Sequence, residues 1–310
     1  YEPLLASFLV GRILRAGDDA LGAGALRARI ALREGVTPLG IEPTAAARDR
    51  YTEASAAGAF GRAPELLCPH FRRGDGFNCA VWAHRNATCS TWFCKHERGA
   101  KSATFWKRLR DMLALVEARL TRPGIPVAVE ARLSRWCALE VGIGDAALGE
   151  LIGTSDLAGE RRAPDAGGAS ARYRSIWGDW AGREEAYYIG CATAVEALAW
   201  HDVERICGAD ATLDARLVRQ ALGGLAADAE APREIRLGDV DVGPPDDDGF
   251  VVVRGYSEYD PLVLPAPLLD ALRSVDGRPT DDALAALRER RVVLEPDLLA
   301  ALVDFEILKV

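Results

Sequence analysis

Cysteine and histidine are concentrated in one short stretch of this 310-residue chain. Four of the seven cysteines and three of the four histidines lie between Cys68 and His96. Thiolates and imidazoles are the side chains that bind zinc, and thiolates also hold iron–sulfur clusters. The alternative without metal is a set of reduced cysteines that pack as small hydrophobic residues. Their clustering among glycine- and asparagine-rich turns favours a metal site over that alternative.

The four cysteines are spaced Cys-x10-Cys-x9-Cys-x4-Cys, at Cys68, Cys79, Cys89 and Cys94. Structural zinc sites usually use tight Cys-x2–4-Cys pairs, and ferredoxins use tight spacings too. The spacing therefore leaves zinc and a [4Fe–4S] cluster open. We predict that the four thiolates are the ligands. His70, His84 and His96 are expected to support the site or the fold without binding the metal, and Trp82 is among the aromatic residues that could shield it.

The remaining cysteines, Cys137, Cys191 and Cys207, fall on apolar helical faces and are expected in the core. Cys191 is the first candidate if a remote thiolate completes the cluster. Secreted disulfide frameworks are usually short, with an even number of cysteines. An odd and clustered set predicts a reducing, cytoplasmic location instead.

The net charge of −8 argues against broad binding to nucleic acid or to anionic membranes, which needs an excess of Lys and Arg. No stretch approaches the roughly 20 apolar residues of a membrane span. The apolar run at the start is interrupted by Gly11 and Arg12, so we expect an amphipathic helix there, not a signal peptide.

Periodicity predicts helices through most of the chain. Residues 1–66 are Ala-rich with breaks at glycine and proline, and an apolar stripe from Phe105 to Leu120 gives the clearest helix. Further helices are expected over Val127–Leu139, Arg183–Cys207 with a stop at Gly208, and Leu213–Leu222. Residues 156–172 have no apolar period and are expected to form an exposed loop.

The pattern changes near residue 234. Apolar residues with polar neighbours over 235–242 and an apolar run over 250–253 predict two strands, and three short helices are expected after them. The fold class predicted is α+β, mostly α. A helical domain with a loop-rich cysteine insert would be followed by a small winged-helix-like module. The expected divisions are 1–155, a linker at 156–172, a helical segment at 173–228 that packs on the first domain, and 232–310.

The cysteine window resembles a known family. Its Cys68-Pro-His-Phe, an Asp-Gly turn, and Cys79-Ala-Val-Trp-Ala-His-Arg85-Asn-Ala-Thr-Cys89 are similar to the YkgJ-type zinc- or iron-chelating proteins, and flagellin lysine N-methylases carry a related set. The resemblance implies that Cys68, Cys79 and Cys89 are cluster cysteines, with Trp82 and Arg85 at the family's aromatic and arginine positions. The chain departs from the family's pattern in two ways: no cysteine precedes Cys68, and Asn86 stands where the family has a proline. Cys94 would then supply a missing ligand.

Residues 234–310 resemble the PqqD-type modules, which are winged-helix domains that recognise leader peptides. The likeness rests on the strand pair, on Val263-Leu264-Pro265, on Asp276-Gly277-Arg278-Pro279-Thr280 and on the apolar end from Leu298. It implies a protein or peptide partner. A packing or dimerisation domain of the same shape is the alternative, and the acidic Asp246–Asp248 argues against DNA.

The chain has no P-loop, no Gly-x-Gly-x-x-Gly after a strand and no Gly-x-Ser-x-Gly motif. The first hypothesis is therefore a cytoplasmic metalloprotein with a [4Fe–4S] cluster and a C-terminal interaction module. Alternatives are a lysine-methylase-like or peptide-maturing enzyme, a structural zinc protein, and a redox sensor. Whether the chain is an enzyme stays open.

Overall fold

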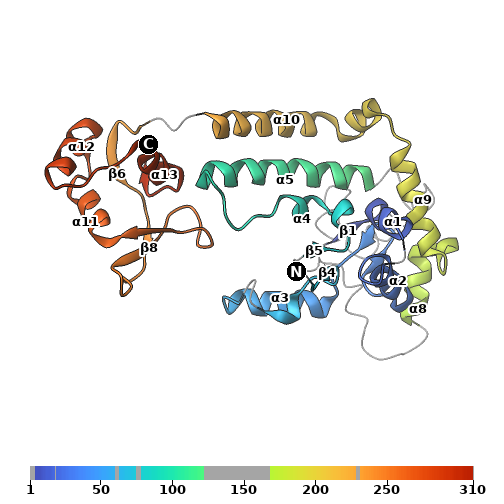
Figure 1. Cartoon of the computed structure of the whole chain (residues 1–310). Coiled ribbons are helices and arrows are strands. Elements are labelled where there is room, and N and C mark those ends of the chain that lie inside the picture. Colours follow the sequence, from blue (N-terminus) through green and yellow to red (C-terminus); the bar gives the residue numbers. More distant parts are fainter. Residues whose placement is uncertain are drawn as a thin grey trace. The chain divides into compact units, whose positions relative to one another are not determined.

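A computed structural model describes residues 4–17, 19–59, 63–74, 78–121, 168–227 and 231–309 (Figure 1). The fold is α+β and mostly α-helical, with small antiparallel sheets, which confirms the predicted class. The chain divides into two units: Tyr1–Ser90 with Leu113–Ala211, and Thr91–Met112 with Thr212–Val310. Besides the predicted module at 232–310, the second unit thus includes Thr91–Met112, which separates the two segments of the first unit in sequence, and the residues from Thr212 onward.

The first unit contains helices joined to very short strands. Its helices are α1 (Ser7–Arg15), α2 (Ala23–Leu32), α3 (Ala45–Ala56), α4 (Ala87–Thr91), α8 (Gly168–Trp177) and α9 (Glu184–Glu196), with 3-10 turns η1 (Pro64–Leu66), η2 (Trp82–His84) and η5 (Gly178–Trp180). Its strands are β1 (Leu5–Ala6), β2 (Val36–Thr37) and β3 (Gly40–Ile41), in the order β1-β3-β2, and the pair β4 (Phe71–Arg72) and β5 (Asn78–Cys79). Helices α5 (Gly99–Thr121) and α10 (Trp200–Ala226) contribute residues to both units.

The core of the first unit forms where α1 and α9, distant in sequence, pack side by side (Figure 1). The apolar face expected near the start is confirmed, because Phe8, Leu9, Ile13 and Leu14 are all buried. Apolar side chains that leave water in this way supply most of the stabilisation of a fold.

Aromatic side chains of α8 and α9 pack edge to face in that core. The Trp177 ring centroid lies 5.2 Å from that of Tyr187 and 5.8 Å from that of Tyr188. Both tyrosines are buried, and their hydroxyls donate to the carbonyls of Pro38 (2.9 Å) and Thr37 (2.6 Å). These bonds satisfy polar groups that would otherwise be costly to bury, and they tie α9 to the turn between β2 and β3.

The second unit contains two small sheets and three short helices. The strands are β6 (Glu234–Leu237), β7 (Asp241–Val242), β8 (Phe250–Arg254), β9 (Leu262–Pro265), β10 (Arg278–Pro279) and β11 (Leu308–Lys309). They form the antiparallel orders β10-β6-β11 and β7-β8-β9. The helices α11 (Ala266–Ser274), α12 (Thr280–Glu289) and α13 (Pro296–Asp304) complete a core that includes Ile235, Leu272 and Leu302. The strand expected over 250–253 and the three short helices are thus present, whereas the strand expected over 235–242 is split into β6 and β7, which belong to different sheets.

Other predicted elements need correction. The apolar stripe from Phe105 to Leu120 does lie in α5. The single helix expected over Arg183–Cys207 is instead α9 and the start of α10. The stop expected at Gly208 is confirmed: its φ of 69° and ψ of −159° are not helical, and it separates two helical segments within α10. The second segment continues to Ala226, beyond the predicted Leu222. Residues 168–172 of the expected loop belong to α8, whereas 156–167, Val127–Leu139 and Cys137 lie outside the described residues.

Candidate metal centre

A short hairpin brings Cys68 and Cys79 toward each other. In the β4–β5 pair, Phe71 lies opposite Cys79. The Phe71 amide donates to the Cys68 carbonyl at 3.0 Å, and the Ala80 amide donates to the His70 carbonyl at 2.8 Å. The turn at Cys68 therefore sits beside the strand that carries Cys79, although ten residues separate them in sequence.

Cys89 lies in α4, whose start is held by Asn86. The Asn86 side-chain oxygen accepts a hydrogen bond from the Cys89 amide at 2.8 Å, as an N-cap does. The side-chain amide of Asn86 donates to the Leu4 carbonyl, also at 2.8 Å. Asn86 is buried, so both bonds replace contacts with water. The residue that departs from the YkgJ-type pattern thus fixes the backbone of a predicted ligand.

Arg85 and Trp82 form a stacked pair next to Cys89. The Arg85 guanidinium carbon lies 3.4 Å from the Trp82 ring centroid, within the range of a cation–π contact. Arg85 also donates from Nε to the Trp82 carbonyl at 3.2 Å and from Nη1 to the Cys89 carbonyl at 3.3 Å. Through these bonds the arginine links η2 to the first turn of α4.

The thiols of Cys68, Cys79 and Cys89 lie close enough to interact electrostatically. Burial, which has the largest effect, and the nearby Cys68 and Cys79 thiols raise the pKa of Cys89 to about 11. Arg85 lowers the Cys89 pKa, whereas Glu117 raises it. Neighbouring thiols that disfavour one another's ionisation are a common arrangement where a bound cation would offset the repulsion.

Glu117 is a member of this group that the sequence did not reveal. It lies on α5, and burial raises its pKa to about 7, although a hydrogen bond from the Ala87 amide lowers that pKa in part. Its position four residues after Leu113 and three before Leu120 places it on the apolar stripe of the helix. An acid on such a stripe is the one signal that could have identified it.

Cys94 is in the second unit, where it is exposed, so only three of the four predicted ligands belong to one unit. Of the other cysteines, Cys191 and Cys207 are buried, as expected. Cys191 packs in the core cluster of the first unit.

The three histidines of the window have separate environments. The buried His70 bonds through Nδ1 to the Leu21 carbonyl at 2.7 Å. His84 lines a pocket with Arg12, Arg15 and Glu196; burial lowers its pKa, the two arginines lower it further, and Glu196 raises it. In the second unit, His96 has other partners: its amide donates to Asp260 at 2.9 Å and its Nδ1 lies 3.1 Å from the Tyr256 hydroxyl.

The donor chemistry fits a thiophilic metal, because the Cys68 and Cys79 thiols and the Glu117 carboxyl all influence the pKa of Cys89, and the three cysteines are half-buried. Within the described ranges, however, no three His, Cys, Asp or Glu side chains are already grouped around a metal position. Across the same residues, no helix has the length and apolar character that crossing a bilayer requires.

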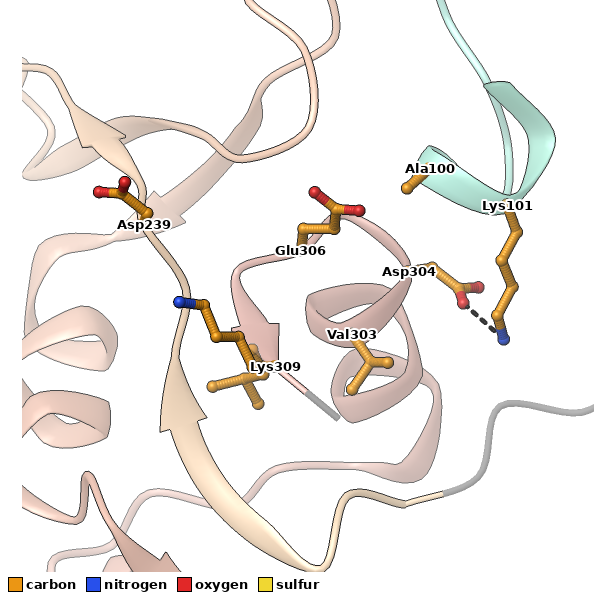
Figure 2. A pocket seen from close by; sticks show the side chains of 8 residues that line it. Ala100, Lys101, Asp239, Val303, Asp304, Glu306 and Lys309 are labelled. Atoms are coloured by element: carbon orange, nitrogen blue, oxygen red, sulfur yellow. Dashed lines mark ion pairs between the residues drawn. The ribbon is translucent and has the colours of Figure 1, made fainter. Parts of the chain in front are cut away.

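The second unit has a pocket of its own, of about 510 Å³, beside the end of α13 (Figure 2). Figure 2 shows Lys101 of α5 facing Asp304, and their ion pair is 3.0 Å long. Arg98 also pairs with the buried Asp304 and donates to the Leu225 carbonyl at 3.0 Å. The exposed charges of Asp239, Glu306 and Lys309 complete a mixed lining. A polar surface of both signs suits a peptide better than an apolar small molecule.

Comparison with family models, with curated proteins and with solved structures gives no match to this chain. The likeness of residues 68–94 to YkgJ-type proteins, and of 234–310 to PqqD-type modules, therefore stays a prediction.

Proposed function

We propose that this protein is a metalloprotein that holds an iron–sulfur cluster, most simply [4Fe–4S], through Cys68, Cys79, Cys89 and Cys94. The observation that carries the proposal is that the thiols of Cys68 and Cys79, from a turn and a strand, lie near enough to Cys89 on a helix to influence its pKa. Three cysteines from three elements have little reason to converge for packing alone, because one small apolar residue fills such a gap equally well. Reduced thiols of this kind fit a cytoplasmic location.

A structural zinc ion is the alternative occupant of the same ligands. Zinc accepts thiolate and carboxylate ligands in a tetrahedral site, and the nearby Glu117 carboxyl gives this alternative specific support. The two occupants differ in colour and in composition, so one preparation distinguishes them.

The test is anaerobic purification of the full chain, followed by visible absorbance and by iron, sulfide and zinc analysis. An iron–sulfur cluster gives a brown protein with iron and acid-labile sulfide in equal amounts. Stoichiometric zinc in a colourless protein would show that the site holds zinc and not an iron–sulfur cluster. A protein that binds neither metal, even after reconstitution with iron and sulfide or with zinc, would refute the metal centre.

We further propose that the second unit binds a protein or peptide partner. The mixed charges around the pocket of Figure 2 and the exposed side chains of Phe250, Tyr259 and Val263 support this role. Titration of the full chain with peptides encoded beside its gene, followed by calorimetry, tests it. Absence of saturable binding to any of them would leave the packing or dimerisation role.

A further inference from the structure

A second pocket, of about 370 Å³, lies in the first unit and has no part in the proposed metal centre. Its walls come from the last turn of α2, from α3, and from the stretch between η1 and Pro69. The volume is at the lower end of the range for small-molecule sites. The size therefore suits a ligand of roughly one ring or a short chain.

One wall of this pocket is apolar. The apolar lining residues are Pro43, Ala47, Leu66, Leu67 and Pro69. Leu67 and Pro69 flank Cys68 in sequence, so a ligand here would contact the loop that carries a predicted metal ligand. Apolar surface of this kind contributes binding free energy only to a ligand with an apolar body.

The rest of the lining is polar with an excess of positive charge: it consists of Arg29, Arg48 and Arg50, a single acid, Glu65, and the uncharged Tyr51 and Thr52. Arg29 is held in place by its bonds to the carbonyls of Glu34 (2.8 Å) and Glu42 (2.5 Å). Arg48 donates to the Pro43 carbonyl at 3.0 Å. Backbone acceptors thus orient two of the three guanidinium groups, and Arg29 Nε also lies 3.9 Å from the carboxylate of Glu34.

The carboxyl nearest to Arg48 balances its charge only in part. Glu42 Oε2 lies 3.6 Å from Arg48 Nη1, and the Glu42 side chain is 5 % exposed. Burial raises the pKa of Glu42 to about 7, although Arg48 lowers it in part, so this carboxyl is largely uncharged below neutral pH. By contrast, in the pocket beside His84 both Arg12 and Arg15 already contact the charged group of Glu196, at 3.1 and 2.5 Å.

We propose that the pocket between α2, α3 and Pro69 binds a small organic anion, with its carboxylate or phosphate group on Arg48 and Arg50 and its apolar body against Leu67 and Pro69. Guanidinium groups bind both anions through paired N–H donors, so the charge is recognised and not the element that bears it. The apolar wall selects organic anions over inorganic ones.

Calorimetric titration of the full chain with benzoate, phenyl phosphate, inorganic phosphate and benzamide tests this proposal. Benzoate or phenyl phosphate should bind saturably. Benzamide, which has the ring without the charge, should not bind, and inorganic phosphate should bind more weakly than phenyl phosphate. Loss of one charged hydrogen-bond donor should weaken the binding of the organic anion about tenfold in Arg48→Gln and in Arg50→Gln.

Arg50 is exposed, so Arg50→Gln should fold even if Arg48→Gln does not. The matched control is Arg205→Gln, which removes an exposed arginine whose side chain pairs with Asp202 and lies outside the pocket lining. The control should bind as the parent does. The proposal is overturned if neither organic anion binds, if inorganic phosphate binds as tightly as phenyl phosphate, or if Arg50→Gln retains the parent affinity. The side chains tested here are not among the proposed metal ligands.

Discussion

The Asn86 side chain caps the helix that carries Cys89, accepting a hydrogen bond from the Cys89 amide at 2.8 Å. The same side chain donates to the carbonyl of Leu4, so the helix of a predicted metal ligand is fastened to the start of the first unit. Because the buried Asn86 side chain makes both bonds, it holds the backbone of Cys89 in place and so helps to position the Cys89 thiol. The metal centre therefore depends on more than the residues that would bind metal.

Asn86→Ala should destabilise the first unit by about 1–2 kcal/mol, because α4 loses its cap and the Leu4 carbonyl loses a buried donor. It should also lower metal occupancy, since Cys89 is no longer held. Urea unfolding followed by circular dichroism measures the first effect and metal analysis the second. Asn78→Ala, at an exposed position of β5, is the control and should change neither. Equal stability of the two variants would show that the cap is unimportant.

Cys79→Ser and Cys89→Ser should each lose the metal, because each removes one of the three converging thiolates. A structural metal can supply on the order of 10 kcal/mol of folding free energy, so both variants should also unfold at lower urea concentration. Cys207→Ser, which changes a buried cysteine of α10, should keep full metal occupancy. Full occupancy in both window variants would show that the ligand assignment is wrong.

Cys94 and Glu117 are the two candidates for the fourth ligand of the proposed metal centre. We expect Cys94→Ser to lower metal content and Glu117→Gln to leave it near the parent value. The cause is that a cluster iron prefers thiolate to carboxylate. Metal analysis of the two variants, prepared side by side, decides between them. The reverse result would assign the fourth position to Glu117 and would favour zinc.

Glu42 should make the protein less stable as the pH rises from about 4.5 to 7. The folded state keeps the Glu42 proton up to about pH 7, whereas the unfolded state releases it near 4.5. The native state then binds more protons over this interval, so the free energy of unfolding falls, by on the order of 3 kcal/mol, and stays low above it. Glu42→Gln should remove this fall and be more stable than the parent at pH 8.

Urea midpoints at pH 4.5 and 8 measure that difference. Glu53→Gln replaces an exposed acid of α3 and serves as the control, with parental behaviour at both pH values. A parent and a Glu42→Gln variant with the same pH dependence would contradict the burial of a protonated carboxyl.

The sequence predicted some parts of this arrangement well and missed others for physical reasons. Composition alone located Cys68, Cys79 and Cys89, and the long apolar stripe located α5. Strands of two residues, such as β1 and β3, show no alternation and escape a periodic analysis. Asn86 was visible only as a departure from a pattern, because a cap is defined by backbone geometry. Glu117 and Glu42 acquire their raised pKa values from burial. The apolar stripe of α5 gives a hint of this burial for Glu117, whereas the burial of Glu42 depends on tertiary packing.

Gly238 and Gly255 should not accept a larger side chain without destabilising the second unit. A Cβ at Gly238 would lie 2.2 Å from the Glu306 carbonyl oxygen, and one at Gly255 would lie 2.1 Å from the Phe305 carbonyl oxygen. Two segments thus pack against consecutive peptide groups in the turn after α13, a turn that Glu306 makes with a positive φ of 58°. Because these contacts are to backbone, the turn must move to admit a methyl group.

Gly238→Ala and Gly255→Ala should each cost about 2–3 kcal/mol, a typical value for forced overpacking. Glu306 lines the pocket of Figure 2, so both variants should also weaken binding of any peptide that this pocket accepts. Gly243→Ala is the matched control, since its nearest neighbour would be 3.7 Å away, an ordinary contact distance. Thermal and urea unfolding should show that the control is as stable as the parent and that the other two variants are less stable. If Gly238→Ala and Gly255→Ala unfold at the same temperature and urea concentration as the control, the turn after α13 is free to shift and does not shape the pocket.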